Sequence, residues 1–279
     1  MTIIDGKAIS AKIREDLKKE VAALKVQGTT PGLAVILVGD DEASAVYVRN
    51  KARACDELGM YSVVHKLPAS TCKEDLIALV RECNADKALH GILVQLPLPK
   101  HLDPLEILRE VDPNKDVDGL HVVTAGRLLV GEKGFIPCTP KGVIRLIKST
   151  GTEIAGKRAV VVGRSNMVGK PVSLLLLNEN ATVTMCHSRT KDLDKVCAEA
   201  DILVSAIGKP GLITGEFIKP GAVVIDVGTT KVDGKLRGDV LFDEAAEKAS
   251  FITPVPGGVG PMTITMLMEN TIEAARIYG

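Results

Sequence analysis

Residues 158–169 read RAVVVGRSNMVG, and a helical stretch at 170–177 follows them directly. The apolar run at 158–162 predicts a buried strand, and Gly163 and Gly169 predict a tight loop into the helix. Such a strand–loop–helix presents backbone N–H groups and a positive helix end to a phosphate. The spacing departs from G-x-G-x-x-G, because Ser165 takes the second glycine position and the last glycine comes one residue late. The loop alone is therefore weak evidence for nucleotide binding, and the residues around it are needed to support this interpretation.

The next predicted strand, 182–186, bears on which dinucleotide the loop binds. A binder of NAD places a carboxylate after this strand, where it contacts the ribose hydroxyls. Here the chain continues His187-Ser188-Arg189-Thr190. Cations and hydroxyls suit a 2′-phosphate, and Arg164 lies in the glycine loop itself. Each arginine alone reads as an ordinary surface charge, but together, at both expected positions, they favour NADP as the cofactor.

Strands and helices alternate in two series along the chain, and this loop lies within the second. The first series comprises predicted helices at 9–24, 44–58 and 73–84 and strands at 33–38, 61–67 and 91–95. The second comprises helices at 141–148, 170–177 and 262–276 and strands at 158–162, 182–186, 202–205 and 222–227. Alternation of this kind predicts parallel sheets covered by helices. The segment 96–140, rich in Pro, Asp and Gly, is predicted to form ordered loops that end at a domain boundary near 137–140.

Composition narrows the function classes. Thirty-five basic residues balance 35 acidic ones, and Trp is absent, which disfavours a nucleic-acid or membrane-surface binder. The six cysteines form no C-x-x-C pair and no zinc spacing, so no metal site is expected. The N-terminus lacks the pattern of a signal peptide, and no apolar run is as long as a membrane span. We expect a cytosolic protein with reduced cysteines.

Ser44, Tyr47 and Lys51 lie at i, i+3 and i+7 of a predicted helix that follows a buried strand. Open α/β sheets bind ligands at this end of their strands. Burial or nearby donors can lower the pKa of a lysine until it acts as a base near neutrality. Tyr and Lys four residues apart are usually structural, however. Short-chain dehydrogenases carry the same pair after their nucleotide loop, whereas here it precedes the loop by more than a hundred residues, which argues against that class.

Three further segments are candidates for ligand contact. Gln95 ends a buried strand, so its amide needs hydrogen-bond partners. The acidic stretch 112–120 suggests a calcium loop, but the ligand frame fails and a turn is the alternative. The stretch 254–263, PVPGGVGPMT, would let backbone approach a ligand closely, although loop chemistry alone could explain its glycines.

In this order, these segments resemble the bifunctional methylenetetrahydrofolate dehydrogenase/methenyltetrahydrofolate cyclohydrolase family. The resemblance runs through most of the chain and agrees in length and domain order. The matching stretches are YVRNK at 47–51, VQLPLP at 94–99, KDVDG at 115–119, PCTP at 137–140, the loop 163–169, and PGGVGPMT at 256–263.

The resemblance implies two α/β domains with a cleft between them. Residues 1–139 would bind folate and carry out catalysis, and 140–261 would form a Rossmann-type NADP-binding domain, with the helix 262–279 packed back onto the first. It also implies a cytoplasmic homodimeric enzyme of one-carbon metabolism and purine biosynthesis. This enzyme would oxidise 5,10-methylenetetrahydrofolate to 5,10-methenyltetrahydrofolate with NADP, then hydrolyse the product to 10-formyltetrahydrofolate.

The resemblance also implies residue roles. Lys51 would handle protons in the hydrolysis, Tyr47 would stack on the folate, Gln95 would tune the lysine and Asp118 would bind the pterin. The substrate contacts implied are Tyr47, Lys51, Val94, Gln95, Leu96, Asp118, Pro256, Gly257, Gly258, Val259 and Gly260. The cofactor contacts implied are Gly163, Arg164, Ser165, Val168, Gly169, Ser188, Arg189 and Thr229.

One departure concerns Thr229-Thr230, where the family typically has Ile-Asn near the nicotinamide, so contacts there can differ. Cys138 matches a family cysteine, for which packing is the expected role. Two alternatives stand beside the bifunctional enzyme: a monofunctional relative with one activity, and a non-catalytic nucleotide sensor. The intact set of Tyr47, Lys51, Gln95 and Asp118 disfavours the sensor, because a sensor would not need these residues together.

Overall fold

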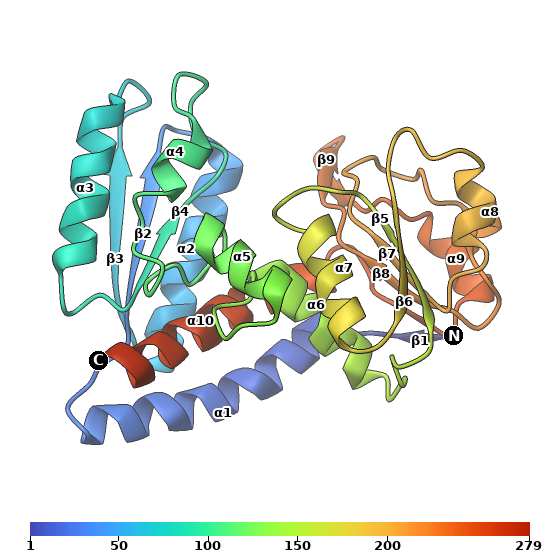
Figure 1. The fold of residues 1–279 in the computed structure, drawn as a ribbon, viewed down its shortest axis with the longest axis horizontal. Helices are drawn as coiled ribbons and strands as arrows, with labels where there is room; N and C mark the ends of the chain where they lie inside the picture. The colour runs from blue at the N-terminus through green and yellow to red at the C-terminus, as the bar shows by residue number, and fades with distance from the viewer. The chain divides into compact units, whose positions relative to one another are not determined.

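The computed structural model describes residues 1–279, with the exception of the side chain of Ala43. The chain forms two compact units (Figure 1). Unit 1 comprises Met1–Ala11 and Thr139–Thr263, and unit 2 comprises Lys12–Cys138 and Ile264–Gly279. Two long helices, α1 (Gly6–Val26) and α10 (Val259–Tyr278), contribute residues to both. Among the described residues, none of the helices has both the length and the apolar character needed to span a bilayer.

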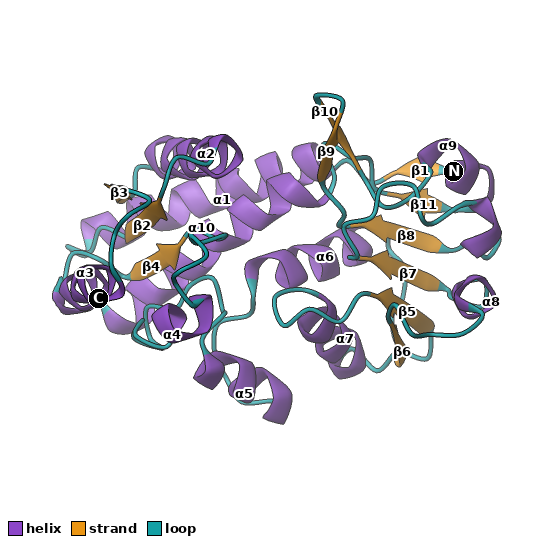
Figure 2. Cartoon of the chain, turned by 90° about the horizontal axis from the view of Figure 1, so that it is seen from above, coloured by secondary structure: helices purple, strands orange, loops and turns teal.

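Unit 2 is built on a three-stranded parallel sheet in the order β3-β2-β4, with β2 (Gly32–Val38), β3 (Tyr61–Leu67) and β4 (Gly91–Val94). The central strand β2 is buried along its whole length, as its apolar sequence predicts. Helices α3 (Lys73–Ala85) and α4 (Pro104–Leu108) cover one face of the sheet. Helices α2 (Glu42–Leu58) and α10 lie on the other face (Figure 2).

Unit 1 contains a six-stranded parallel sheet in the order β1-β11-β8-β7-β5-β6. Its strands are β1 (Thr2–Ile3), β5 (Arg158–Val162), β6 (Thr182–Cys186), β7 (Ile202–Ser205), β8 (Val223–Asp226) and β11 (Phe251–Ile252). Helices α8 (Leu193–Cys197) and α9 (Phe242–Lys248) pack on one face, and α6 (Cys138–Ser149) and α7 (Gly169–Asn178) lie on the other (Figure 2). The first strand of the series, β5, has β6 on one side and β7 on the other, so the winding direction reverses at β5.

The predicted alternation of strands and helices is confirmed, and both sheets are parallel as expected. Helix α2 begins two residues before its predicted start, because Asp41 Oδ2 caps it by accepting from Ser44 N at 2.7 Å. The prediction of loops at 96–140 missed α4 and α5 (Val122–Val130). Both helices are started by local caps, Asp103 and His121. Because the helices are short, they show no long apolar periodicity in the sequence.

The N-terminus differs from the predicted domain limits, which grouped residues 1–139. Residues 1–11 form part of unit 1, because β1 pairs in parallel with β11 and extends the large sheet by one strand. A two-residue strand with both side chains exposed leaves no apolar pattern in the sequence. The antiparallel hairpin of β9 (Thr230–Val232) and β10 (Lys235–Arg237) was likewise not predicted, and it is also short and exposed.

Asn270 of α10 ties this helix to the loops of unit 2. Its side chain is fully buried, and Nδ2 donates to the carbonyls of Val117 at 2.8 Å and Ile136 at 2.9 Å. Both acceptors lie in loop segments rather than in a sheet, so a side-chain amide supplies the donors that regular structure would otherwise provide. The helix thereby fixes the backbone on either side of α5.

We expect Asn270→Leu to lower the free energy of unfolding by about 2–4 kcal/mol, because the Ile136 carbonyl loses this donor and the Val117 carbonyl keeps only the weak thiol donor of Cys138. Chemical denaturation followed by circular dichroism measures this change. The matched control, Gln27→Leu, places the same side chain at an exposed position and should shift stability by less than about 0.5 kcal/mol. Equal effects of the two variants would contradict the role assigned to Asn270.

Candidate functional site

The candidate reactive centre of unit 2 lies at the carboxyl ends of two neighbouring strands. Strand β2 leads through Gly39-Asp40-Asp41 into α2, which carries Tyr47 and Lys51, and β4 ends one residue before Gln95. Strand β2 pairs with β3 on one side and with β4 on the other, so the winding reverses between β2 and β4. Parallel α/β sheets bind ligands at such a point, outside the carboxyl ends of the strands.

Lys51 and Gln95 are in direct contact there. Lys51 is only 8% exposed, and its Nζ donates to Gln95 Oε1 at 2.8 Å. The amide of Gln95 is oriented by its second hydrogen bond, from Nε2 to the Leu96 carbonyl at 2.7 Å. Its backbone N–H also donates to Ile36 O, which anchors Gln95 to β2. The amide that the sequence required to be satisfied therefore holds the lysine in place.

Burial lowers the pKa of Lys51 from its ordinary value of 10.5, and the nearby charge of Asp118 opposes part of this shift. Water around an exposed lysine stabilises the ammonium form, and this water is largely excluded here. The lysine can therefore exist as a neutral amine at a lower pH than a surface lysine. A neutral amine accepts a proton, which suits Lys51 for acid–base chemistry.

Asp118 is half-buried on a turn that a second carboxylate organises. Asp116 is buried and accepts from the backbone N–H groups of Leu120 and His121. It also accepts from Thr124 Oγ1 at 2.6 Å. Burial raises the pKa of Asp116 to about 6, although these hydrogen bonds act in the opposite direction. The turn at Asp118 is thus fixed from inside the fold, and its carboxylate stays available at the surface.

Gly119 and Cys138 also hold this turn in place. Gly119 has a φ of 72°, and a Cβ there would lie 2.6 Å from the backbone nitrogen of Pro137, so a side chain is excluded. Cys138 is buried and its Sγ donates to Val117 O at 3.2 Å. This contact agrees with the packing role expected for Cys138. The acidic stretch that suggested calcium forms a turn in which Asp112 Oδ1 accepts from Asn114 N.

The remaining predicted residues of unit 2 differ in what they offer a ligand. Tyr47 is 41% exposed on α2, which leaves a ring face accessible for stacking, whereas Ser44 is buried at the start of the same helix. Val94 is 3% exposed and packs in the core beneath α3 and α4, so only its backbone could meet a ligand. Leu96 is half-buried and precedes a cis peptide bond to Pro97.

The candidate cofactor loop of unit 1 follows β5 and is shaped by two glycines. Gly163 has a φ of 126°, and a Cβ there would lie 2.3 Å from the Ala206 carbonyl oxygen. At Gly169 a Cβ would lie 2.2 Å from the carbonyl oxygen of Gly163. Neither position accepts a side chain, so both glycines are needed for the loop to fold back over the start of α7. The loop lies where the winding of the large sheet reverses.

Ser165, at the position of the missing glycine, accepts hydrogen bonds from the backbone at the start of α7. Its Oγ accepts from Val168 N at 3.1 Å and Gly169 N at 3.3 Å, and its carbonyl accepts from Lys170 N. These early helix amides are therefore already paired, which reduces the set of backbone donors that the sequence predicted for a phosphate. The hydroxyl hydrogen of Ser165 remains able to donate, at the positive end of the α7 dipole.

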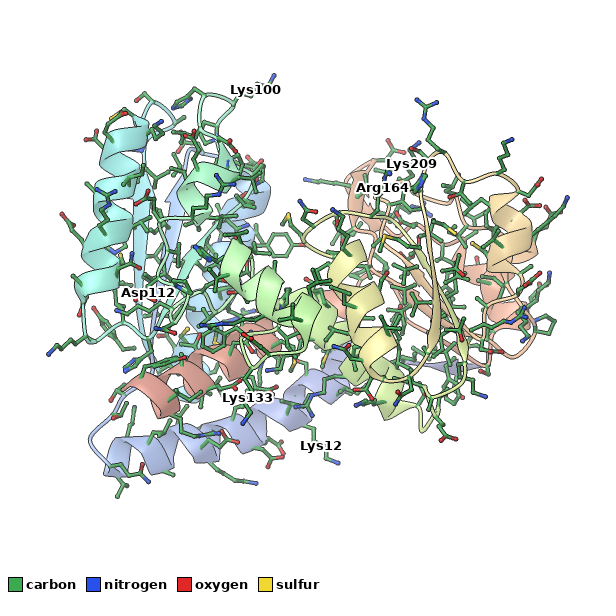
Figure 3. All side chains as sticks on the ribbon, viewed as in Figure 1. Lys12, Lys100, Asp112, Lys133, Arg164 and Lys209 are labelled. Atoms are coloured by element: carbon green, nitrogen blue, oxygen red, sulfur yellow. The ribbon has the colours of Figure 1, made fainter. Side chains whose placement is uncertain are left out.

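Arg164, Ser188 and Arg189 are all exposed. The pairing of Val162 with Cys186 sets the ends of β5 and β6 beside each other, and Gly163 N donates to Cys186 O at 2.9 Å. The two loops that carry the arginines are thus neighbours at one edge of the sheet. The segment 187–190 contains no carboxylate, so nothing in it would repel a 2′-phosphate. Figure 3 shows Arg164 and Lys209 at this same end of unit 1.

Other predicted ligand contacts also belong to unit 1. The loop Pro256–Gly260 packs against the start of α1, where Lys7 N donates to Gly257 O and a Cβ on Gly6 would lie 1.9 Å from Gly258 O. Thr229 is exposed, and its Oγ1 donates to Val227 O at 3.2 Å. The structure therefore groups Tyr47, Lys51, Gln95 and Asp118 in one unit, and the nucleotide loop and the 256–260 loop in the other.

Two buried aspartates were not predicted from the sequence, namely Asp226 at the end of β8 and Asp239 after β10. Burial raises the pKa of Asp226 to about 6, and the neighbouring Asp239 adds to this effect. A usable signal was present for Asp226, because it closes an apolar strand just as Gln95 follows one. Asp239 lies in a polar segment between a hairpin and a helix, where nothing in the pattern indicates burial.

Comparison with known proteins assigns both halves of the chain. The model of the tetrahydrofolate dehydrogenase/cyclohydrolase catalytic domain matches residues 4–118, and that of the tetrahydrofolate dehydrogenase/cyclohydrolase NAD(P)-binding domain matches 137–278. The bifunctional protein FolD of Moorella thermoacetica is 58% identical over 275 residues, which is 98% of each chain.

Solved structures give the same result. The bifunctional enzyme FolD, methylenetetrahydrofolate dehydrogenase/cyclohydrolase, of Campylobacter jejuni superposes with a TM-score of 0.97 at 48% identity, over 99% of each chain. The Trypanosoma brucei methylenetetrahydrofolate dehydrogenase-cyclohydrolase, solved with NADP and an inhibitor, gives 0.95 at 44% identity over 99% of this chain and 97% of that one. The chain therefore belongs to the tetrahydrofolate dehydrogenase/cyclohydrolase family.

Proposed function

We infer that this chain carries out both reactions of its family. It oxidises 5,10-methylenetetrahydrofolate to 5,10-methenyltetrahydrofolate with NADP, and it hydrolyses the product to 10-formyltetrahydrofolate. Relatives named as bifunctional match nearly the whole chain, which favours two activities over the monofunctional alternative. The observation that carries the proposal is the buried Lys51, held by Gln95 and close enough to Asp118 for their charges to interact.

Lys51 is proposed as the group that handles protons in the hydrolysis. Water adds to the methenyl carbon and loses one proton to a base. The hydroxyl of this adduct then loses its proton as the formyl C=O forms, and the bond from that carbon to N5 breaks, so that N5 keeps the electron pair and takes up a proton. The formyl group stays on N10, and one proton is released overall. A neutral Lys51 amine can accept the proton of the attacking water, and burial favours the neutral form. The positive charge of the methenyl substrate would disfavour a lysine ammonium further, so substrate binding and the lowered pKa act together.

The same unit is proposed to bind the folate. The exposed ring of Tyr47 offers a stacking face for the pterin. Asp118 offers a carboxylate that can accept paired hydrogen bonds from the pterin amino edge. Gln95 fixes Lys51 through its oriented amide, and Leu96 and the backbone of Val94 line the same strand end. The loop Pro256–Gly260 is proposed to contribute backbone contacts to the substrate.

NADP is proposed to bind unit 1. It supplies the nicotinamide that accepts the hydride, a transfer that depends on alignment of donor and acceptor more than on an acid or base. Gly163 and Gly169 allow the loop to pack tightly at the start of α7, and a phosphate is proposed to bind beside the Ser165 hydroxyl at this helix end. Arg164, Ser188 and Arg189 fit the 2′-phosphate, and Val168 and Thr229 complete the proposed contacts. The proposed NADP contacts thus all lie in unit 1, whereas the proposed folate contacts lie in unit 2 with the exception of the loop Pro256–Gly260, which belongs to unit 1.

We also propose that the enzyme is a cytoplasmic homodimer. All six cysteines are free in the described structure, and five of them are buried, which suits a reducing compartment. The proposal of a homodimer rests on the family resemblance.

A two-step assay tests the function. Purified enzyme should reduce NADP with methylenetetrahydrofolate and, separately, hydrolyse methenyltetrahydrofolate without NADP; no turnover in either assay would contradict the proposal.

We expect Lys51→Met to lower the hydrolysis rate by at least about 100-fold while part of the dehydrogenase activity remains, because only hydrolysis needs the proton acceptor. The control Lys66→Met, at an exposed position on β3, should keep both activities. Full hydrolysis by Lys51→Met would refute the role of Lys51.

The pH dependence follows from the direction of the Lys51 pKa shift. The hydrolysis rate should rise with pH as the amine loses its proton, and should level off below pH 10.5. Asp118→Asn should lower the Lys51 pKa further, because the nearby negative charge that favours the ammonium is removed. NMR titration of the Lys51 side chain in the ligand-free protein measures both values. Asp56→Asn, exposed on the same helix, is the control and should leave the Lys51 pKa unchanged.

Cofactor choice is tested by replacing Arg164 and Arg189 with Ala. Loss of charge-assisted hydrogen bonds to the 2′-phosphate should raise the KM for NADP by about 10- to 100-fold. The KM for NAD, which lacks this phosphate, should change little. Arg158→Ala removes an exposed arginine from the opposite end of β5 and serves as the control. A similar rise for NAD and NADP would refute the assignment.

A further inference from the structure

Asp239 lies fully buried at the carboxyl edge of the large sheet, in a region that the proposed mechanism does not use. Its Oδ2 accepts from Ser205 Oγ at 3.0 Å and from Ile207 N at 2.8 Å. Its Oδ1 accepts from Lys209 N at 2.8 Å. All three donors belong to the last residue of β7 and the loop that follows. One carboxylate therefore determines the path of this loop.

The loop after β7 is in direct contact with the candidate nucleotide loop. Ala206, between the two anchored residues Ser205 and Ile207, presents the carbonyl that would lie 2.3 Å from a Cβ on Gly163. Ala206 N in turn donates to Val162 O at 2.8 Å, one residue before Gly163. A shift of the β7 loop would therefore displace the backbone at Gly163. Lys209, anchored by the same carboxylate, lies at the same end of unit 1 as Arg164 (Figure 3).

Asp239 is itself held in position by Asp226. Asp226 Oδ1 accepts from Asp239 N at 3.0 Å and from Gly228 N at 2.9 Å, and Oδ2 accepts from Val240 N at 2.9 Å. The loops after β7 and β8 are thus connected to the segment that follows the hairpin through two carboxylates. This network explains why two aspartate side chains are tolerated in a buried region, since their carboxyl oxygens accept hydrogen bonds from the surrounding backbone and from Ser205.

We propose that Asp239 is a positioning residue for NADP: it fixes the loop after β7 against Gly163 and so shapes the nucleotide site without touching the cofactor. The inference rests on the proposed binding of NADP by unit 1. Hydrolysis of methenyltetrahydrofolate requires no NADP, so the same enzyme supplies an internal measure of whether the folate site remains intact.

Asp239→Asn is the primary test. Whichever way the amide is oriented, its NH₂ faces the backbone N–H of Ile207 or Lys209, so at least one anchor is lost. The Kd and KM for NADP should rise by about 10- to 100-fold, with the hydrolysis rate within about twofold of wild type. Ser205→Ala removes one of the three donors and should raise the Kd for NADP by a smaller factor. Asp243→Asn, four residues along and exposed, should leave the Kd unchanged.

The outcomes separate this inference from the proposed function. If wild-type enzyme has both activities but Asp239→Asn and Ser205→Ala bind NADP as tightly as Asp243→Asn does, the positioning role is overturned. If Asp239→Asn loses both activities and its cooperative unfolding transition, Ser205→Ala decides, and an unchanged Kd for NADP in that variant overturns the role. Absence of both activities in wild-type enzyme would instead overturn the proposed function.

Discussion

The hydrogen bond from Lys51 Nζ to Gln95 Oε1 is the contact on which the proposed chemistry of unit 2 depends. It joins a helix that follows one strand to the residue directly after the neighbouring strand, so the parallel pairing of β2 with β4 positions both partners. The same packing that brings them together excludes water and lowers the pKa of the lysine. Geometry and basicity therefore share one cause, the burial of α2 against the end of the sheet.

Buried carboxylates play a matching part in each unit. Asp116 accepts from the backbone of Leu120 and His121 and so presents Asp118, and Asp239 accepts from the backbone of Ile207 and Lys209. In both places a loop at the functional edge lacks the ladder partners that a strand would have. A carboxylate can satisfy several N–H donors at once, which makes it an efficient organiser of irregular backbone.

The sequence predicted the elements whose patterns are periodic and the residues that end apolar strands. The two α/β series follow from the alternating patterns, whereas the link between Lys51 and Gln95 was implied only by the family resemblance. The pairing of β2 with β4 explains this link, because neighbouring parallel strands end at one edge. The sequence did not predict the short helices α4, α5, α8 and α9, the strands β1 and β11, or the β9–β10 hairpin, because an apolar period has little length in which to show there. It also missed Asp239, whose burial results from loops that only the tertiary fold brings together.

The candidate residues of unit 2 include a buried lysine, whereas those of unit 1 include exposed arginines. The different needs of the two reactions account for this difference. Water addition transfers a proton, so it needs a titratable group whose protonation is adjustable, and unit 2 supplies a buried lysine. Hydride transfer needs alignment, and unit 1 supplies a cradle of close backbone contacts at Gly163 and Gly169 with exposed cations at its rim. In their proposed roles, Arg164 and Arg189 can remain solvated before NADP arrives, because they would bind charge and exchange no proton. In its proposed role, Lys51 gains from burial, which lowers its pKa in the free enzyme, and the positive charge of the methenyl substrate would lower this pKa further.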